Sequence, residues 1–206
     1  MKVLILGGFL GSGKTTVLLQ LARYLTDHTD SDSQYRVLIV ENEVGETGVD
    51  DQYLRGEGLA VETLFAGCAC CSLSGDLVRM FQRLRKEYDP EWIVLEATGI
   101  AMPENIRIVL KASMQLESHS VVLVDANRWK RIRIPLHDLL WDQISGADTI
   151  LINKSDLVDD NTLNEIEKEI HSINEKADVF RICALHPIQE DLWEHIIKQG
   201  ADQYDT

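Results

Sequence analysis

A glycine-rich loop between an apolar strand and a helix constrains this chain more than any other feature. The stretch GGFLGSGKTT, residues 7–16, directly follows the apolar run KVLIL and leads into the helical pattern KTTVLLQLARYL. Gly8, Gly13, Lys14 and Thr15 fit the pattern G-x-x-x-x-G-K-[ST], in which backbone N–H groups and a helix N-terminus surround phosphate oxygens. The stretch therefore predicts a phosphate-binding strand–loop–helix unit.

Each polar group of this loop has an expected contact with a bound nucleotide. Lys14 is expected to reach the β- and γ-phosphates, the Thr15 hydroxyl to bind Mg²⁺, and Thr16 to contact the α-phosphate. The remaining loop positions are expected to hold phosphate; they are Gly8, Gly11, Ser12 and Gly13. The alternative is a glycine-rich turn that happens to precede a helix. The motif alone does not distinguish ATP from GTP.

Apolar, β-branched runs alternate with amphipathic helical patterns along the whole chain. Most runs are continuously apolar, as in strands covered on both faces. Strands are predicted at 2–7, 36–41, 91–96, 120–125, 149–153 and 179–183, and helices at 14–27, 74–88, 103–114, 136–146, 160–174 and 189–198. This alternation predicts an α/β chain with the three-layer P-loop NTPase fold, a mostly parallel central β-sheet flanked by helices, in a single domain over residues 1–206.

Charge and hydropathy argue against several classes of partner. The chain has 34 acidic and 20 basic residues, a formal net charge of −14, so its surface should repel nucleic acid and anionic membranes. No apolar run is long enough to span a membrane, and the short N-terminal run is expected to be a buried strand rather than a signal peptide. Three of the four cysteines lie in CACC, where neighbours cannot easily pair as disulfides, so we expect reduced thiols and a cytoplasmic protein.

The stretch ILINKSDLV indicates which base, guanine or adenine, the bound nucleotide carries. Asn153, Lys154 and Asp156 follow an apolar strand, at the edge where α/β sheets bind ligands. A carboxylate at Asp156 can accept hydrogen bonds from guanine N1–H and the 2-amino group, whereas adenine lacks this pair of donors. The stretch therefore favours GTP over ATP. The alternative is that Ser155 or Asp156 only caps a turn.

A third strand end carries an acid that suits magnesium. In EWIVLEATG, Glu96 ends an apolar run and Gly99 follows three residues later, as in the D-x-x-G element of GTPases with Glu in place of Asp. A carboxylate there can bind Mg²⁺, usually through water, and the Gly99 N–H could sense the γ-phosphate. Lys14, Thr15, Glu96 and Gly99 are thus the candidate catalytic set. The alternative is an ordinary strand end with an exposed acid.

The cysteine cluster in FAGCACCSLSGDL predicts a metal site. Cys68, Cys70 and Cys71 precede a helical pattern, and a helix N-terminus favours the thiolate form that binds metal. Zinc takes sulfur ligands tetrahedrally, and Glu41 and Glu46 after the second strand are candidate further ligands. The alternatives are small buried cysteines and, for the acids, a solvated loop.

Taken in order, GGFLGSGKTT, ENEVGETGVDD, GCACCSLSGDL, EATGIAMPENI and NKSDLV resemble the CobW-like GTPases, relatives of the HypB and UreG metal-insertion GTPases. The resemblance runs from Met1 to about Val158. It implies a SIMIBI-type GTPase that handles zinc or cobalt in metal delivery or cobalamin synthesis. It also implies a metal site (Zn²⁺ or Co²⁺) at Cys68, Cys70 and Cys71 with Glu41 and Glu46 close by, a homodimer, and a client metalloprotein or corrinoid-related protein.

The sequence also departs from that family. Longer members carry a C-terminal domain and often a histidine-rich stretch, and neither is expected here. The third base-recognition loop should lie near RICALHPIQ, which places Cys183 and Ala184 beside the guanine. Because the chain shows no obvious catalytic base, turnover without a partner is expected to be slow. Two rival functions remain open, a GTP-dependent adaptor without enzymatic activity and an ATP-using small-molecule kinase.

Overall fold

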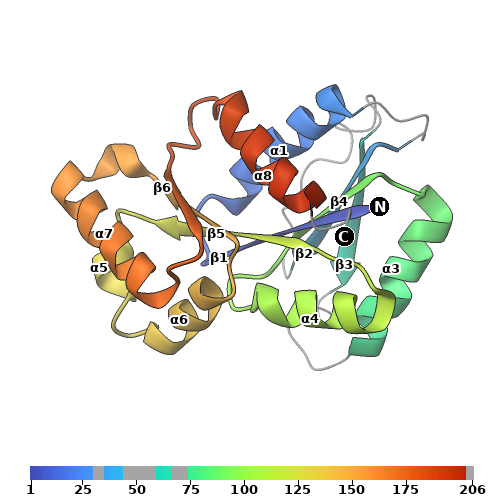
Figure 1. Ribbon diagram of the computed structural model, residues 1–206, viewed down its shortest axis with the longest axis horizontal. Helices are drawn as coiled ribbons and strands as arrows, with labels where there is room; N and C mark the ends of the chain where they lie inside the picture. The colour runs from blue at the N-terminus through green and yellow to red at the C-terminus, as the bar shows by residue number, and fades with distance from the viewer. Residues whose placement is uncertain (30–34, 44–58, 66–73, 203–206) are drawn as a thin grey trace.

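The computed structural model describes residues 1–29, 35–43, 59–65 and 74–202, which form a parallel sheet between two layers of helices (Figure 1). The strands are β1 (Lys2–Gly8), β2 (Val37–Glu43), β3 (Leu59–Phe65), β4 (Trp92–Glu96), β5 (His119–Asp125), β6 (Thr149–Asn153) and β7 (Asp178–Arg181). The helices are α1 (Lys14–His28), α3 (Ser74–Tyr88), α4 (Pro103–Met114), α5 (Trp129–Ile132), α6 (His137–Ser145), the short 3₁₀ helix η1 (Ser155–Leu157), α7 (Asp160–Ile173) and α8 (Glu190–Asp202).

All strand pairings in this sheet are parallel, in the order β3-β2-β4-β1-β5-β6-β7. The predicted α/β fold with a central parallel sheet flanked by helices is confirmed. Strand β1 lies between β4 and β5, so the glycine-rich loop leaves the middle of the sheet. Because the strands run in one direction, their carboxyl ends share one edge, where Glu96, Asp125 and Asn153 end their strands.

Helices cover both faces of the sheet because the central strands are apolar on both sides. Every residue of β5 and β6 is buried. Helices α1 and α8 lie together on one face, and α3, α4, α6 and α7 on the other (Figure 1). On the first face Leu18 and Leu21 of α1 pack with Leu4 and Leu6 of β1. Each fully buried leucine contributes about 1.5–3 kcal/mol of transfer free energy, so this packing fixes α1 behind the loop.

Strand β3 and the short helices α5 and η1 were not predicted from the sequence patterns. Strand β3 reads LAVETLF, in which Glu62 and Thr63 interrupt the apolar run, and within the described chain it pairs only with β2. An edge strand needs no continuous apolar run, and this one therefore lacked the expected signature. Helix α5 is a single turn, too short for a helical periodicity. Among the described residues, no helix is long and apolar enough to cross a membrane.

Candidate functional site

The glycine-rich loop leaves β1 in a conformation that two of its glycines make possible. Gly8 has φ +127°, and a Cβ there would lie 2.3 Å from the carbonyl oxygen of Leu123 on β5. Gly13 has φ +99° at the start of α1, and a Cβ there would lie 2.3 Å from Nδ2 of Asn153. Side chains at either position would be strained and would clash, so the loop conformation depends on these glycines.

Lys14, Thr15 and Glu96 meet at the start of α1, as the sequence predicts. The Thr15 hydroxyl donates to the Glu96 carboxylate, with Oγ1 3.4 and 3.3 Å from its two oxygens. The Lys14 ammonium donates to the Phe9 carbonyl at 3.3 Å and lies 4.0 Å from Glu96 Oε1. Burial lowers the pKa of Lys14, and the charge of Glu96 partly opposes this shift. The group thus joins a cation, a hydroxyl and a carboxylate from two neighbouring strand ends.

The donor set of this corner fits a nucleotide and a hard cation. Carboxylate and hydroxyl oxygens are the ligands that Mg²⁺ prefers, and Thr15 and Glu96 supply one of each. Ser12 is 1% exposed, and its hydroxyl has no hydrogen-bond partner among the described residues, as expected for a group that awaits a ligand oxygen. Thr16 is exposed in the first turn of α1, next to Thr15.

Asn153 joins three segments of the site through one side-chain amide. Its Nδ2 donates to the Ser12 carbonyl at 2.8 Å, and its Oδ1 accepts from the Lys154 N–H at 2.8 Å and the Ala184 N–H at 2.9 Å. Because this amide is buried and hydrogen-bonded through both its nitrogen and its oxygen, it fixes the phosphate loop, the Asn153–Asp156 stretch and the loop after β7 relative to one another.

Lys154 lies across the phosphate loop and is held by an acid that the sequence analysis missed. Its ammonium donates to the Gly11 carbonyl at 2.7 Å and to Asp125 Oδ2 at 2.7 Å. Asp125 ends β5 with 3% exposure and also accepts the Arg128 N–H, while the Arg128 guanidinium donates to the Leu10 carbonyl at 2.9 Å. The sequence contains a signal for this acid, because Asp125 ends an apolar strand in the same way as Glu96 does.

Asp156 is exposed and lies beside the loop after β7, where the sequence places Cys183 and Ala184. The interaction of the Cys183 thiol with the Asp156 carboxylate raises the pKa of Cys183. Ser155 binds the same loop, because its N–H and hydroxyl both donate to the Ile182 carbonyl, at 3.2 and 2.9 Å. The structure therefore brings Asn153, Lys154, Asp156, Cys183 and Ala184 together.

The loop after β4 lies against the phosphate loop. A Cβ at Gly99 would lie 2.8 Å from the Leu10 nitrogen, so the two loops are in contact. Gln143 of α6, which is 1% exposed, donates from Nε2 to the carbonyls of Gly99 at 3.1 Å and Ala101 at 2.9 Å. Sequence reasoning missed this residue, because its partners are more than 40 residues away.

The predicted metal ligands fall into two groups. Glu41 is buried on β2 and lies opposite Glu96 in the register of β2 and β4, so the two acids are neighbours at this edge of the sheet. Glu46, Cys68, Cys70 and Cys71 lie outside the described residues. Within the residues that are described, no group of three or more His, Cys, Asp or Glu could hold a metal ion. The cysteine site therefore stays a prediction.

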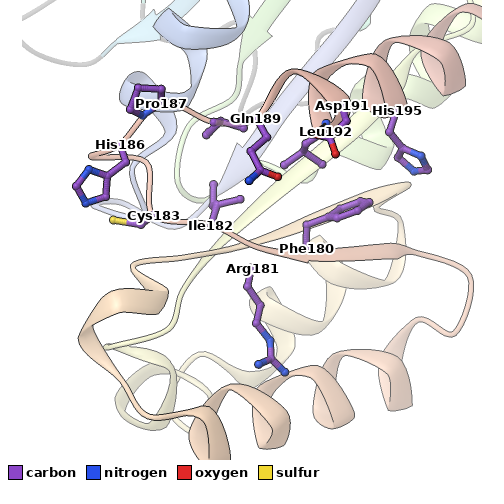
Figure 2. A pocket seen from close by; sticks show the side chains of 11 residues that line it. Phe180, Arg181, Ile182, Cys183, His186, Pro187, Gln189, Asp191, Leu192 and His195 are labelled. Carbon is purple, nitrogen blue, oxygen red and sulfur yellow. Dashed lines mark hydrogen bonds between the residues drawn. The ribbon is translucent and has the colours of Figure 1, made fainter.

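A cavity of about 470 Å³ lies away from the phosphate loop (Figure 2). It lies between β7 and the start of α8, and its lining includes Phe180, Leu192 and His195. The phosphate and base residues described above, except Cys183, do not line it. The candidate site is therefore the set of polar side chains at the sheet edge and not this cavity.

Similar proteins were found among curated sequences. The chain is 30% identical to the zinc chaperone YjiA of Escherichia coli over 87% of its own length and 57% of that protein. It is 29% identical to the zinc-regulated GTPase metalloprotein activator 1 of Dictyostelium discoideum, over 93% of this chain and 48% of that one. The chain spans about half the length of the curated relatives that it matches.

Solved structures share the fold. HypB from Helicobacter pylori, in complex with nickel, superposes with a TM-score of 0.69 at 20% identity, covering 99% of this chain and 89% of that one. Zn(II)-bound YjiA from E. coli superposes with a TM-score of 0.64 at 24% identity, covering 93% and 60%. Residues 2–181 match the family described as CobW/HypB/UreG, nucleotide-binding domain. The chain, with its phosphate loop, Glu96 and the Asn153–Asp156 stretch at one sheet edge, belongs to the CobW/HypB/UreG nucleotide-binding-domain family.

Proposed function

We propose that this chain binds and hydrolyses GTP with Mg²⁺, and that its nucleotide state controls the handling of a thiophilic divalent metal. The observation that carries the proposal is the meeting, at one sheet edge, of Thr15 and Glu96 with the Asn153–Asp156 stretch. The names of the relatives, zinc chaperone and zinc-regulated GTPase metalloprotein activator, support metal handling as the purpose.

On the phosphate side, each residue has one task. Lys14 exchanges its contact with the Phe9 carbonyl for the β- and γ-phosphate oxygens. The Thr15 hydroxyl and the Glu96 carboxylate would hold Mg²⁺, which when bound would supply positive charge beside the phosphates. Gly99 directs its N–H toward the γ-phosphate, and Gln143 fixes the carbonyl side of that loop. Binding of GTP should therefore be sensed by the loop after β4.

On the base side, Asp156 selects guanine. Its carboxylate accepts from guanine N1–H and the 2-amino group, and an adenine would leave it without donors. The Lys154 ammonium is already engaged by Gly11 and Asp125, so the lysine chain is held as a fixed surface beside the base. Cys183 and Ala184 complete this side through Asp156 and Asn153.

A titration of GTP against ATP tests the base assignment. We expect the chain to bind GTP at least about tenfold more tightly than ATP, a difference of about 1.4 kcal/mol. Asp156→Asn should remove this preference, because the amide presents a donor toward the donors of guanine. Asp160→Asn, an exposed acid nearby, is the control and should keep it. Equal affinity of the unmodified chain for both nucleotides would refute the GTP assignment.

The metal would be held by Cys68, Cys70 and Cys71 with Glu41 and Glu46, and Zn²⁺ or Co²⁺ suits such thiolates. Glu41 lies opposite Glu96, the proposed magnesium ligand, on neighbouring strands. This adjacency supports coupling between nucleotide and metal, in which each ligand shifts the affinity for the other. A client metalloprotein or a corrinoid-related protein would receive the metal, and a homodimer is the proposed assembly.

Competitive metal titration in the GTP- and GDP-bound states tests this coupling. Cys70→Ala should weaken Zn²⁺ or Co²⁺ affinity, while Cys183→Ala, which changes the cysteine beside Asp156, should not. Single-turnover phosphate release then separates a GTPase from an adaptor that only binds GTP. If metal affinity is the same in both nucleotide states, the switch part of the proposal is wrong.

A further inference from the structure

Gln20 fastens the loop after β7 to the helix that starts in the phosphate loop. Its side-chain Nε2 donates to the carbonyls of Ala184 at 2.9 Å and His186 at 3.2 Å, and its Oε1 accepts the Ile188 N–H at 2.9 Å. All three partners are backbone groups more than 160 residues away along the chain. Figure 2 shows Cys183 and His186 on this loop, between β7 and α8.

The chemistry of glutamine matches these three partners. The loop offers two carbonyl oxygens and one N–H group to the same side chain. An amide has two donors and an acceptor, a carboxylate has only acceptors, and an ammonium has only donors. Glutamine can therefore satisfy all three groups, whereas glutamate would face two carbonyls with a negative charge.

The loop held by Gln20 carries two groups that touch the base-recognition stretch. The Ala184 N–H donates to Asn153 Oδ1 at 2.9 Å, and Cys183 lies close enough to Asp156 for the carboxylate to raise the pKa of its thiol. A shift of this loop would move the partners of both residues. Gln20 itself lies on α1, which begins at Lys14 and packs on the sheet through Val17, Leu18 and Leu21. The side chain thus connects the phosphate end of the site to its base end.

We propose that Gln20 is a positioning residue for base discrimination, which sets the loop after β7 so that Asp156 and Asn153 meet guanine in the correct geometry. The inference rests on the proposed binding of GTP. It assigns to α1 a second role besides presenting Lys14 and Thr15. The loss of Gln20 should therefore weaken recognition of the base and leave recognition of the phosphates intact.

Dissociation constants for GDP, ADP and tripolyphosphate, measured on the whole chain, test the proposal. The variants are Gln20→Glu and Gln20→Leu, with Arg23→Gln on the exposed side of the same helix as the matched control. Gln20→Glu should lower GDP affinity by about tenfold, equivalent to about 1.4 kcal/mol, and change tripolyphosphate affinity by less than about twofold. Gln20→Leu should also reduce the preference for GDP over ADP. Arg23→Gln should keep that preference.

The outcomes separate the two proposals. If the unmodified chain binds GDP and ADP equally, both the proposed GTP site and the role of Gln20 fall. If the unmodified chain prefers GDP and both Gln20 variants keep that preference, Gln20 is not a positioning residue, and the GTP site stands. A parallel loss of GDP and tripolyphosphate affinity in both variants would indicate general damage to the fold and would equally overturn the positioning role.

Discussion

Asp125 restrains Lys154, which lies over the phosphate loop. Its carboxylate is almost fully buried, and it binds the Lys154 ammonium at 2.7 Å while Lys154 also holds the Gly11 carbonyl. Asp125→Asn keeps an oxygen for the Arg128 N–H but removes the charge. Since a hydrogen bond to a charged group contributes about 1.5–3 kcal/mol, we expect GTP affinity to fall by roughly tenfold or more. Calorimetric titration with GTP measures this loss of affinity, and Asp138→Asn, at a fully exposed acid, is the control. Unchanged GTP affinity in Asp125→Asn would contradict the role given to Asp125.

We expect the buried ammonium of Lys14 to lower the free energy of unfolding when no nucleotide is bound. Burial lowers its pKa below the usual 10.5, so the charged form is disfavoured in the folded state. Lys14→Met should therefore raise the thermal midpoint at pH 7, by about 2–4 °C for each kcal/mol gained, while it abolishes phosphate binding. As pH rises through the lowered pKa toward 10.5, the folded state loses a proton that the unfolded state keeps, and stability of the unmodified chain rises. In thermal melts from pH 7 to 10.5, the difference in thermal midpoint between Lys14→Met and the unmodified chain should therefore become smaller.

At the scale of elements, α6 controls the loop after β4 through a single side chain. Gln143 is buried and donates to the Gly99 and Ala101 carbonyls. Gln143→Leu leaves both carbonyls without this donor, which should cost about 1–3 kcal/mol and loosen the loop. Hydrogen exchange should accelerate at residues 98–102 and stay unchanged in β6. Asp142→Asn, on the exposed side of α6, is the control; slow exchange at 98–102 in Gln143→Leu would show that other contacts hold the loop.

The elements also mark what sequence patterns can and cannot reveal. Continuously apolar strands and the residues at their ends could be predicted from the sequence, because burial on both faces requires a local run of apolar residues. Glu96, Asn153 and Asp156 belong to that class. Gln20 and Gln143 do not, since a glutamine in mid-helix has no local pattern, and its role appears only once a partner loop is folded against it.

At the scale of the whole molecule, the site joins the ends of β1, β4, β5 and β6 and the loop after β7, so its ligand should stabilise the entire fold. At 100 times its dissociation constant, GTP with Mg²⁺ adds about 2.7 kcal/mol to the free energy of unfolding. For a chain of this length that is a rise of roughly 5–10 °C in thermal midpoint. Differential scanning fluorimetry should show this rise with GTP and a smaller one with the same concentration of ATP. Identical shifts for both nucleotides would argue against base recognition.

The three-way contact of Asn153 has a consequence for how the protein is made. Ser12 leaves the ribosome long before Ala184, and the Asn153 amide needs both. A nascent chain therefore carries a complete phosphate motif long before it has a complete site. The phosphate loop is therefore synthesised before the groups that complete the site, and full competence for the ligand comes only with β7 and the loop that follows it.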